Sequence, residues 1–290
     1  MLPIINVIAP VLAIIAAGAL WARRGMPFDQ EGTTKLILYL GAPALAFAAL
    51  SEVDLPPDAI GAAAGGYAIA LAVFLILGWG FLRLWGKPVR WFLPALCFPN
   101  NANLGLPILL FAYGESGLSL GVVIMTVTVS VHFSLGISLV AGRWSLLPAL
   151  QQPALWGVAA GLGVMIGGIE VPQAILRTAG LIGDIAIPLA LFSLGHSLSA
   201  LRLSDTAEAV GMALGRVGLG LAGAGAGIWL LDLEGVAAGA VLLQSIMPAA
   251  VFNYMFTDLY GGPSSRIAGV ILASTALSLG TVAILLIYLL

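Results

Sequence analysis

Apolar runs of membrane-spanning length follow one another along almost the whole chain. The 290 residues are 61% hydrophobic and only 8% charged, and a run of roughly 18–25 apolar residues is long enough to cross a bilayer as a helix. The pattern predicts an all-α integral membrane protein with ten transmembrane helices, and it leaves no room for an aqueous enzymatic domain. The expected spans are 3–22, 33–51, 58–84, 89–114, 117–141, 153–170, 173–200, 206–231, 235–260 and 265–290.

The order of the charges predicts how these spans are oriented. No basic residue precedes the first apolar run, whereas Arg23 and Arg24 follow it directly. This order argues against a cleaved signal peptide. Because basic residues favour the cytoplasmic side, it places the N-terminus outside. With ten crossings, most other basic residues then fall at cytoplasmic ends: Lys35, Arg83, Lys87, Arg90, Arg143, Arg202 and Arg266. Arg216 is an exception because it lies within the eighth span. It is expected to reach inward or to pair with Glu208, two turns away.

The fourth span is interrupted between Cys97 and Pro107 by the sequence Cys-Phe-Pro-Asn-Asn-Ala-Asn-Leu-Gly-Leu-Pro. Proline lacks a backbone N–H and clashes with the preceding turn, so Pro99 is expected to break the helix. Backbone groups freed at membrane depth are tolerated only where protein or a water-filled cavity satisfies them. The broken fourth span therefore predicts a cavity, and a cavity at this depth is typical of a site for a solute.

Corresponding features recur 145–149 residues later in the chain. Pro43 in the second span matches Pro188 in the seventh, and Phe98-Pro99 in the fourth matches Met247-Pro248 in the ninth. Five spans per half is an odd number, so residues 1–142 and 153–290 are expected to form two inverted five-helix repeats. Helices four and nine would then run antiparallel and cross where both are broken. Paired interruptions of this kind indicate the binding site of a secondary transporter.

The expected crossing combines charges of both signs. Each break leaves a helix N-terminus, equivalent to roughly +0.5 charge, and a C-terminus of opposite sign. The N-terminal amides suit an anionic group such as a carboxylate, whereas the freed carbonyls suit a cation. The architecture therefore fits an anion carrier, with Na⁺ or H⁺ as a coupling ion and uncoupled uniport both open.

Three segments resemble one known family. Phe98 to Pro107, followed by Tyr113-Gly114, is similar to the fourth span of the auxin efflux carrier family. Gln244 to Pro248, followed by Phe256 and Tyr260-Gly261, resembles its ninth span, and Ile187 to Gly195 resembles its seventh. The likeness covers all ten spans in order.

This resemblance implies a fold akin to sodium/proton antiporters and bile-acid transporters. A scaffold would comprise 1–51 and 153–200, a transport domain 58–141 and 206–290, and the second would move against the first like an elevator. The resemblance also implies a homodimer formed through the scaffold, and it places Asn100 beside the carboxylate of the substrate. Ala249 stands where plant members carry a polar side chain, and the connection near 143–153 is short. A compact bacterial member in the inner membrane, carrying small acids such as malate or malonate, is the expectation.

The candidate substrate-binding residues gather at the two breaks and beside them. At 100° per residue Asn100 and Asn103 share a helix face, although one of the three asparagines is expected only to cap the helix. Gln244 and Asn253 line the site or form interhelical hydrogen bonds. His132 shares a face with Thr128 and is a candidate for the site or for proton coupling. The full set is Pro99, Asn100, Asn101, Asn103, Gln244, Pro248, Asn253, Thr128, His132, Pro43 and Pro188.

Other functional classes find less support in the sequence. No glycine-rich phosphate loop precedes a Lys-Ser/Thr pair, so ATP-driven transport is not expected, and no cluster has the spacing of a metal site. The sequence thus predicts no cofactor, no metal and no nucleic-acid partner. A sodium-coupled symporter of the bile-acid type and a membrane receptor that senses a metabolite stay open as alternatives.

Overall fold

The computed structural model describes residues 2–52, 55–201 and 206–289, and within these ranges the chain is helical without any β-strand element. Arg202, assigned above to the cytoplasmic side, lies outside the described residues. In these described ranges, seven helices are long and apolar enough to cross a membrane: Ile5–Arg23, Gln30–Ser51, Pro57–Leu84, Asn101–Ala141, Gln173–Ala200, Thr206–Leu230 and Ser264–Leu289. Pro153–Gly167 and Gly235–Ser245 are apolar but shorter. The protein is therefore all-α and multi-pass, while the count of ten crossings stays a prediction.

In the described part of the chain, three short π-helical stretches, labelled η, lie between α-helices. In chain order they are α1 (Leu2–Arg23), α2 (Gln30–Leu36), η1 (Ile37–Gly41), α3 (Ala42–Ser51), α4 (Pro57–Leu84), α5 (Val89–Cys97), η2 (Asn101–Gly105), α6 (Leu106–Val131), η3 (His132–Gly136), α7 (Ile137–Ala141), α8 (Leu147–Leu150), α9 (Pro153–Gly167), α10 (Gln173–Asp184), α11 (Ala186–Ala200), α12 (Thr206–Leu230), α13 (Gly235–Ser245), α14 (Val251–Leu259) and α15 (Ser264–Leu289).

The observed helices differ from the expected spans in two ways. The fourth and ninth spans are each divided, because α5 ends at Cys97 and α13 ends at Ser245 before the chain resumes as η2 and α14. The expected connection between spans four and five is instead a kink inside α6. At Gly114 the backbone takes φ 65° and ψ −152°, a conformation that only glycine adopts without strain.

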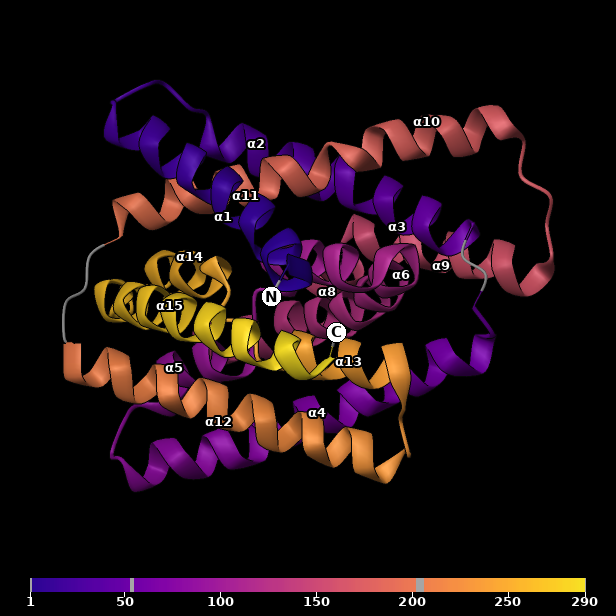
Figure 1. Ribbon diagram of the computed structural model, residues 1–290. Helices are drawn as coiled ribbons and strands as arrows, with labels where there is room; N and C mark the ends of the chain where they lie inside the picture. Colours follow the sequence, from indigo (N-terminus) through magenta and orange to yellow (C-terminus); the bar gives the residue numbers. More distant parts are fainter. Residues whose placement is uncertain (1, 53–54, 202–205, 290) are drawn as a thin grey trace.

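The helices pack in two groups that the chain visits alternately. In the first, α1 packs on α11, and α3 packs on both α9 and α10. In the second, α12 packs on α4, α13 and α15, while α13 also packs on α6. Figure 1 shows α4 and α12 side by side along one edge and α2, α3, α10 and α11 along the opposite edge.

A glycine contact sets the distance between α12 and α4. A Cβ added at Gly227 would lie 2.1 Å from the carbonyl oxygen of Gly66, whereas one added at Gly225 would meet nothing within 4 Å. We expect Gly227→Ala to lower the free energy of unfolding by about 1–3 kcal/mol, because the added methyl group would clash with the backbone of α4, which cannot change rotamer as a side chain can. Gly225→Ala, on the same helix, is expected to be neutral or slightly stabilising. Thermal unfolding of both variants in detergent tests this, and equal effects would contradict it.

An ion cluster joins three segments at one end of the second group. Glu208 on α12 is 4% exposed. It pairs with Lys87, which precedes α5, and with Arg266 on α15, whose Nε donates to Oε1 at 2.7 Å. Of the two alternatives expected for Arg216, the pairing with Glu208 is not seen among the described residues, where Glu208 binds these two cations. Arg216 reaches inward instead, to the backbone described below.

Candidate functional site

The two divided spans meet through their backbones. The N–H of Asn100 donates to the carbonyl oxygen of Pro248 at 2.7 Å, and the N–H of Ala250 donates to that of Phe98 at 3.1 Å. Pro99 and Ala249 stand opposite each other as an antiparallel pair. Proline explains this local structure, since it cannot donate within a helix and it biases the preceding residue toward extended conformations. Phe98, with φ −109° and ψ 98°, is extended accordingly.

Asn100 begins the second half of the fourth span. Its Oδ1 accepts from the N–H of Asn103 at 3.3 Å, so it acts as the N-cap of η2. Its Nδ2 and the side-chain amide of Asn103 make no hydrogen bond to any described residue. The α14 helix starts at Val251, directly after the paired segment. The N-terminal ends of two half-helices therefore lie at the crossing, where their first amides lack intrahelical partners.

Asn101 faces away from Asn100 and ties three helical segments together. Its Nδ2 donates to the hydroxyl of Tyr67 on α4 at 2.9 Å and to Oγ1 of Thr128 on α6 at 2.7 Å. Asn101 and Thr128 are 2% and 3% exposed. The structure therefore brings these two candidates together as an interhelical hydrogen-bonding pair. Tyr67 did not emerge from the sequence, because nothing in the apolar pattern of 58–84 marks it.

Asn253 and His132 surround Phe98. Asn253 Nδ2 donates to the carbonyl oxygen of Phe98 at 3.1 Å. The His132 imidazole stacks on the Phe98 ring at a centroid distance of 4.4 Å, and the Phe256 ring meets it edge-on at 5.5 Å. Both polar side chains are buried, and neither His132 Nε2 nor Asn253 Oδ1 has a hydrogen-bond partner within the described part of the chain. The two side chains also lie close enough to interact with each other, so each faces the other beside Phe98.

Gln244 lies in the last turn of α13, with its amide against η2 and α6. The residue is fully buried, and in the described ranges neither its Oε1 nor its Nε2 has a hydrogen-bond partner. A Cβ added at Gly105 would lie 2.2 Å from Oε1, and one at Gly121 would lie 3.2 Å from Nε2. A buried amide without partners is costly, so its retention here is consistent with a polar ligand.

Pro43 and Pro188 lie outside this cluster. The Pro43 carbonyl borders α9, since a Cβ added at Gly157 would lie 2.4 Å from its oxygen. Pro188 is exposed on α11. Within the residues that the structure describes, no hydrogen bond links either proline to the crossing. Pro99 and Pro248, by contrast, form the paired segment itself.

Arg216 occupies the opposite, C-terminal ends of the broken helices. It is fully buried on α12. Its Nη1 donates to the carbonyl oxygen of Leu96 at 2.8 Å, its Nε to that of Met247 at 3.1 Å, and its Nη2 to that of Ser245. The guanidinium also lies 4.8 Å from the centroid of the Phe74 ring. The paired segment also contacts α15, where Ser274 Oγ accepts a hydrogen bond from the N–H of Ala249 at 3.1 Å.

Comparison with known proteins assigns the chain to a family. A family model described as a membrane transport protein matches residues 3–145 and 137–286. The chain belongs to this family, the auxin efflux carrier family. A search of curated proteins finds no match. As a member of the auxin efflux carrier family the protein is a membrane transporter, and the family is one of transporters rather than enzymes.

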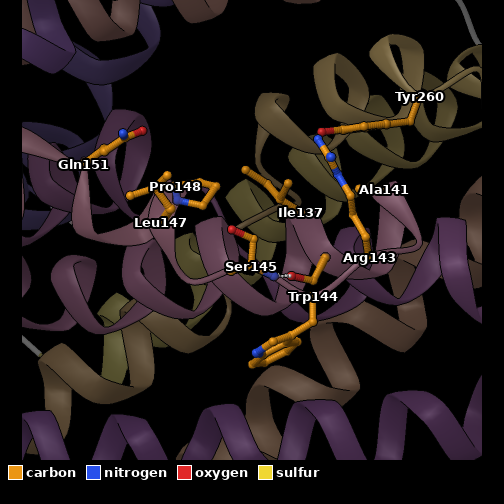
Figure 2. A pocket seen from close by; sticks show the side chains of 10 residues that line it. Ile137, Ala141, Arg143, Trp144, Ser145, Leu147, Pro148, Gln151 and Tyr260 are labelled. Carbon is orange, nitrogen blue, oxygen red and sulfur yellow. Dashed lines mark hydrogen bonds between the residues drawn. The ribbon is translucent and has the colours of Figure 1, made fainter.

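This auxin efflux carrier family member has a pocket of about 420 Å³ whose lining includes neither Phe98 to Asn100 nor Pro248 to Ala250. The pocket is formed by the end of α7, the connection to α8 and the turn after α14. Figure 2 shows the Arg143 side chain extending toward the Tyr260 hydroxyl at its edge. The N–H of Ser145 donates to Ser138 Oγ at 3.0 Å and shapes its wall. None of the candidate substrate-binding residues lines this pocket.

Proposed function

We propose that the protein is a secondary carrier of small organic anions, such as mono- or dicarboxylates. The observation that carries this proposal is the meeting of two half-helix N-termini at Asn100 and Val251, beside the unpaired amides of Asn100 and Asn103. Helix N-termini attract carboxylates through free N–H groups and the helix dipole. Gln244 supplies a further buried amide without partners. We assign Asn100, Asn103 and Gln244 to direct contact with the anion.

The finer architecture is part of the same proposal. We propose ten crossings in two inverted halves, with α5 and η2–α6 forming the fourth and α13 and α14 forming the ninth. The segments 58–141 and 206–290 would move as the transport domain against a scaffold of 1–51 and 153–200. Two observations support this division: the helices of each group pack on one another, and the candidate site is buried. A buried site needs a movement of protein to reach either side of the membrane.

Orientation and assembly follow the charge pattern and the family likeness. We propose a bacterial inner-membrane protein with its N-terminus outside. Lys87 and Arg266 lie together at one end of the bundle through Glu208, which is consistent with a shared cytoplasmic side. A homodimer through the scaffold is proposed on the family likeness alone.

Reconstitution into liposomes tests the function. Charge movement is measured on adding a panel of mono- and dicarboxylates, with protein-free liposomes as the control. A saturable current for at least one acid is expected. Silence across the panel, with saturable binding of one acid to the detergent-solubilised protein, would favour a metabolite-sensing receptor. Silence in both measurements would contradict the proposed substrate class.

A further inference from the structure

The buried Arg216 pairs with no acidic residue in the part of the chain that the structure describes. Among the described residues no carboxylate forms an ion pair with it, since the three ion pairs there join Lys35 to Glu31 and Lys87 and Arg266 to Glu208. A buried cation costs several kcal/mol unless charge and hydrogen bonds compensate it. Here the compensation comes from backbone carbonyls at the ends of α5 and α13. These are the negative ends of two helix dipoles.

The three carbonyls are those that the two breaks set free. Leu96 lies in the last turn of α5, Ser245 is the last residue of α13, and Met247 lies in the interruption that follows. Carbonyls at such interruptions are the groups that hold Na⁺ in ion-coupled carriers. In this protein the guanidinium binds all three. Arginine suits the position because its planar fork carries five donors and a permanent charge.

We propose that Arg216 is a tethered cation that fills the carbonyl site of the crossing, so that the carrier works without a Na⁺ ion bound there. The inference rests on the proposed carrier function and extends it to ion coupling. Arg216 neutralises the C-terminal dipoles, while the N-terminal ends beside Asn100 stay available for the anion. The covalent link to α12 keeps this positive charge in the protein throughout transport.

The first test measures the purified wild-type protein in detergent. Its melting temperature is compared in NaCl, KCl and choline chloride at equal ionic strength, and binding of radioactive Na⁺ is measured in parallel. The expected result is one melting temperature in all three salts and no saturable Na⁺ binding. A saturable rise with Na⁺ that choline does not reproduce would overturn the proposal.

The second test removes the tethered charge. Arg216→Gln is expected to lower the melting temperature in choline chloride by more than about 5 °C, since it leaves buried carbonyls without donors. Na⁺ or K⁺ is expected to restore part of this loss. Arg216→Lys, which retains a charge, is expected to melt between the two and to show no Na⁺ effect. If neither Na⁺ nor K⁺ stabilises Arg216→Gln beyond choline, or if Na⁺ stabilises Arg216→Lys, the proposal is wrong.

These measurements stand apart from the substrate. If Arg216→Gln does not fold, the wild-type and Arg216→Lys results decide the matter. Neither test contains an organic acid. A carboxylate panel without any current therefore contradicts the proposed substrate class, but it does not contradict the proposed role of Arg216. A Na⁺-specific shift in the wild type contradicts the role of Arg216 and leaves the carboxylate panel unaffected. The two failures are therefore distinguishable.

Discussion

Replacing Asn100 with alanine is expected to abolish anion transport while the protein stays folded. Asn100 is 5% exposed at the crossing, and its Nδ2 has no partner within the described residues. A hydrogen bond to a charged group contributes about 1.5–3 kcal/mol, so its loss lowers affinity at least about tenfold. The measurement is the saturable current in liposomes, for whichever acid the carboxylate panel identifies.

The control for this variant separates binding from helix capping. Asn100 Oδ1 caps η2, and loss of an N-cap costs about 1 kcal/mol of stability. Serine retains a capping oxygen but lacks the amide donor. Asn100→Ser is therefore expected to melt like the wild type and to transport as poorly as Asn100→Ala. Because the serine hydroxyl can itself donate a hydrogen bond, wild-type affinity in both Asn100→Ser and Asn100→Ala is the result that would remove Asn100 from the binding site.

Glu208→Gln is expected to cause the largest loss of stability among the variants outside the crossing. The change leaves two cations, Lys87 and Arg266, facing a neutral amide. Breaking a buried ion pair costs roughly 3–5 kcal/mol. We expect about 3 kcal/mol, the lower end, because the two cationic side chains are 22% and 37% exposed. Thermal unfolding in detergent gives the measurement.

A second glutamate provides the matched control. Glu31 pairs with Lys35 one turn later on α2, and their side chains are 81% and 64% exposed. Exposed pairs of this kind contribute little, so Glu31→Gln is expected to leave the melting temperature unchanged. A comparable shift in both variants would show that the loss reflects the changed residue type and not the buried cluster.

The sequence predicted the parts of the site that depend on local chemistry. Proline removes a helical donor and clashes with the preceding turn, and the interruptions at Pro99 and Pro248 agree with that expectation, although Pro10 and Pro94 lie inside helices. The expected capping role of one asparagine is seen at Asn100, whose Oδ1 accepts from the backbone N–H of Asn103, whereas the shared face of the Asn100 and Asn103 side chains stays a prediction. The family was also recognised from the short motifs at the breaks, since these residues carry its likeness.

The partners of buried polar groups could not be predicted in the same way. Arg216 and Glu208 are two turns apart on α12, which suggested a pair. The closer partners belong to segments distant in sequence: Lys87 and Arg266 bind Glu208, and backbone carbonyls bind Arg216. Asn101 finds Tyr67 only because α4 packs against η2. Such contacts depend on tertiary packing, and one sequence carries no record of it.

The backbone pairing at the crossing has a consequence for how such a carrier can change in evolution. Its two hydrogen bonds, from Asn100 to Pro248 and from Ala250 to Phe98, use main-chain atoms alone. Ala249 and Ala250 are buried, so a replacement small enough to fit there, such as serine, is expected to leave those atoms in place. The backbone pairing that holds the crossing together therefore does not depend on which side chains line it. We therefore expect small substitutions at these two positions to change the chemistry of the crossing while the fold is kept.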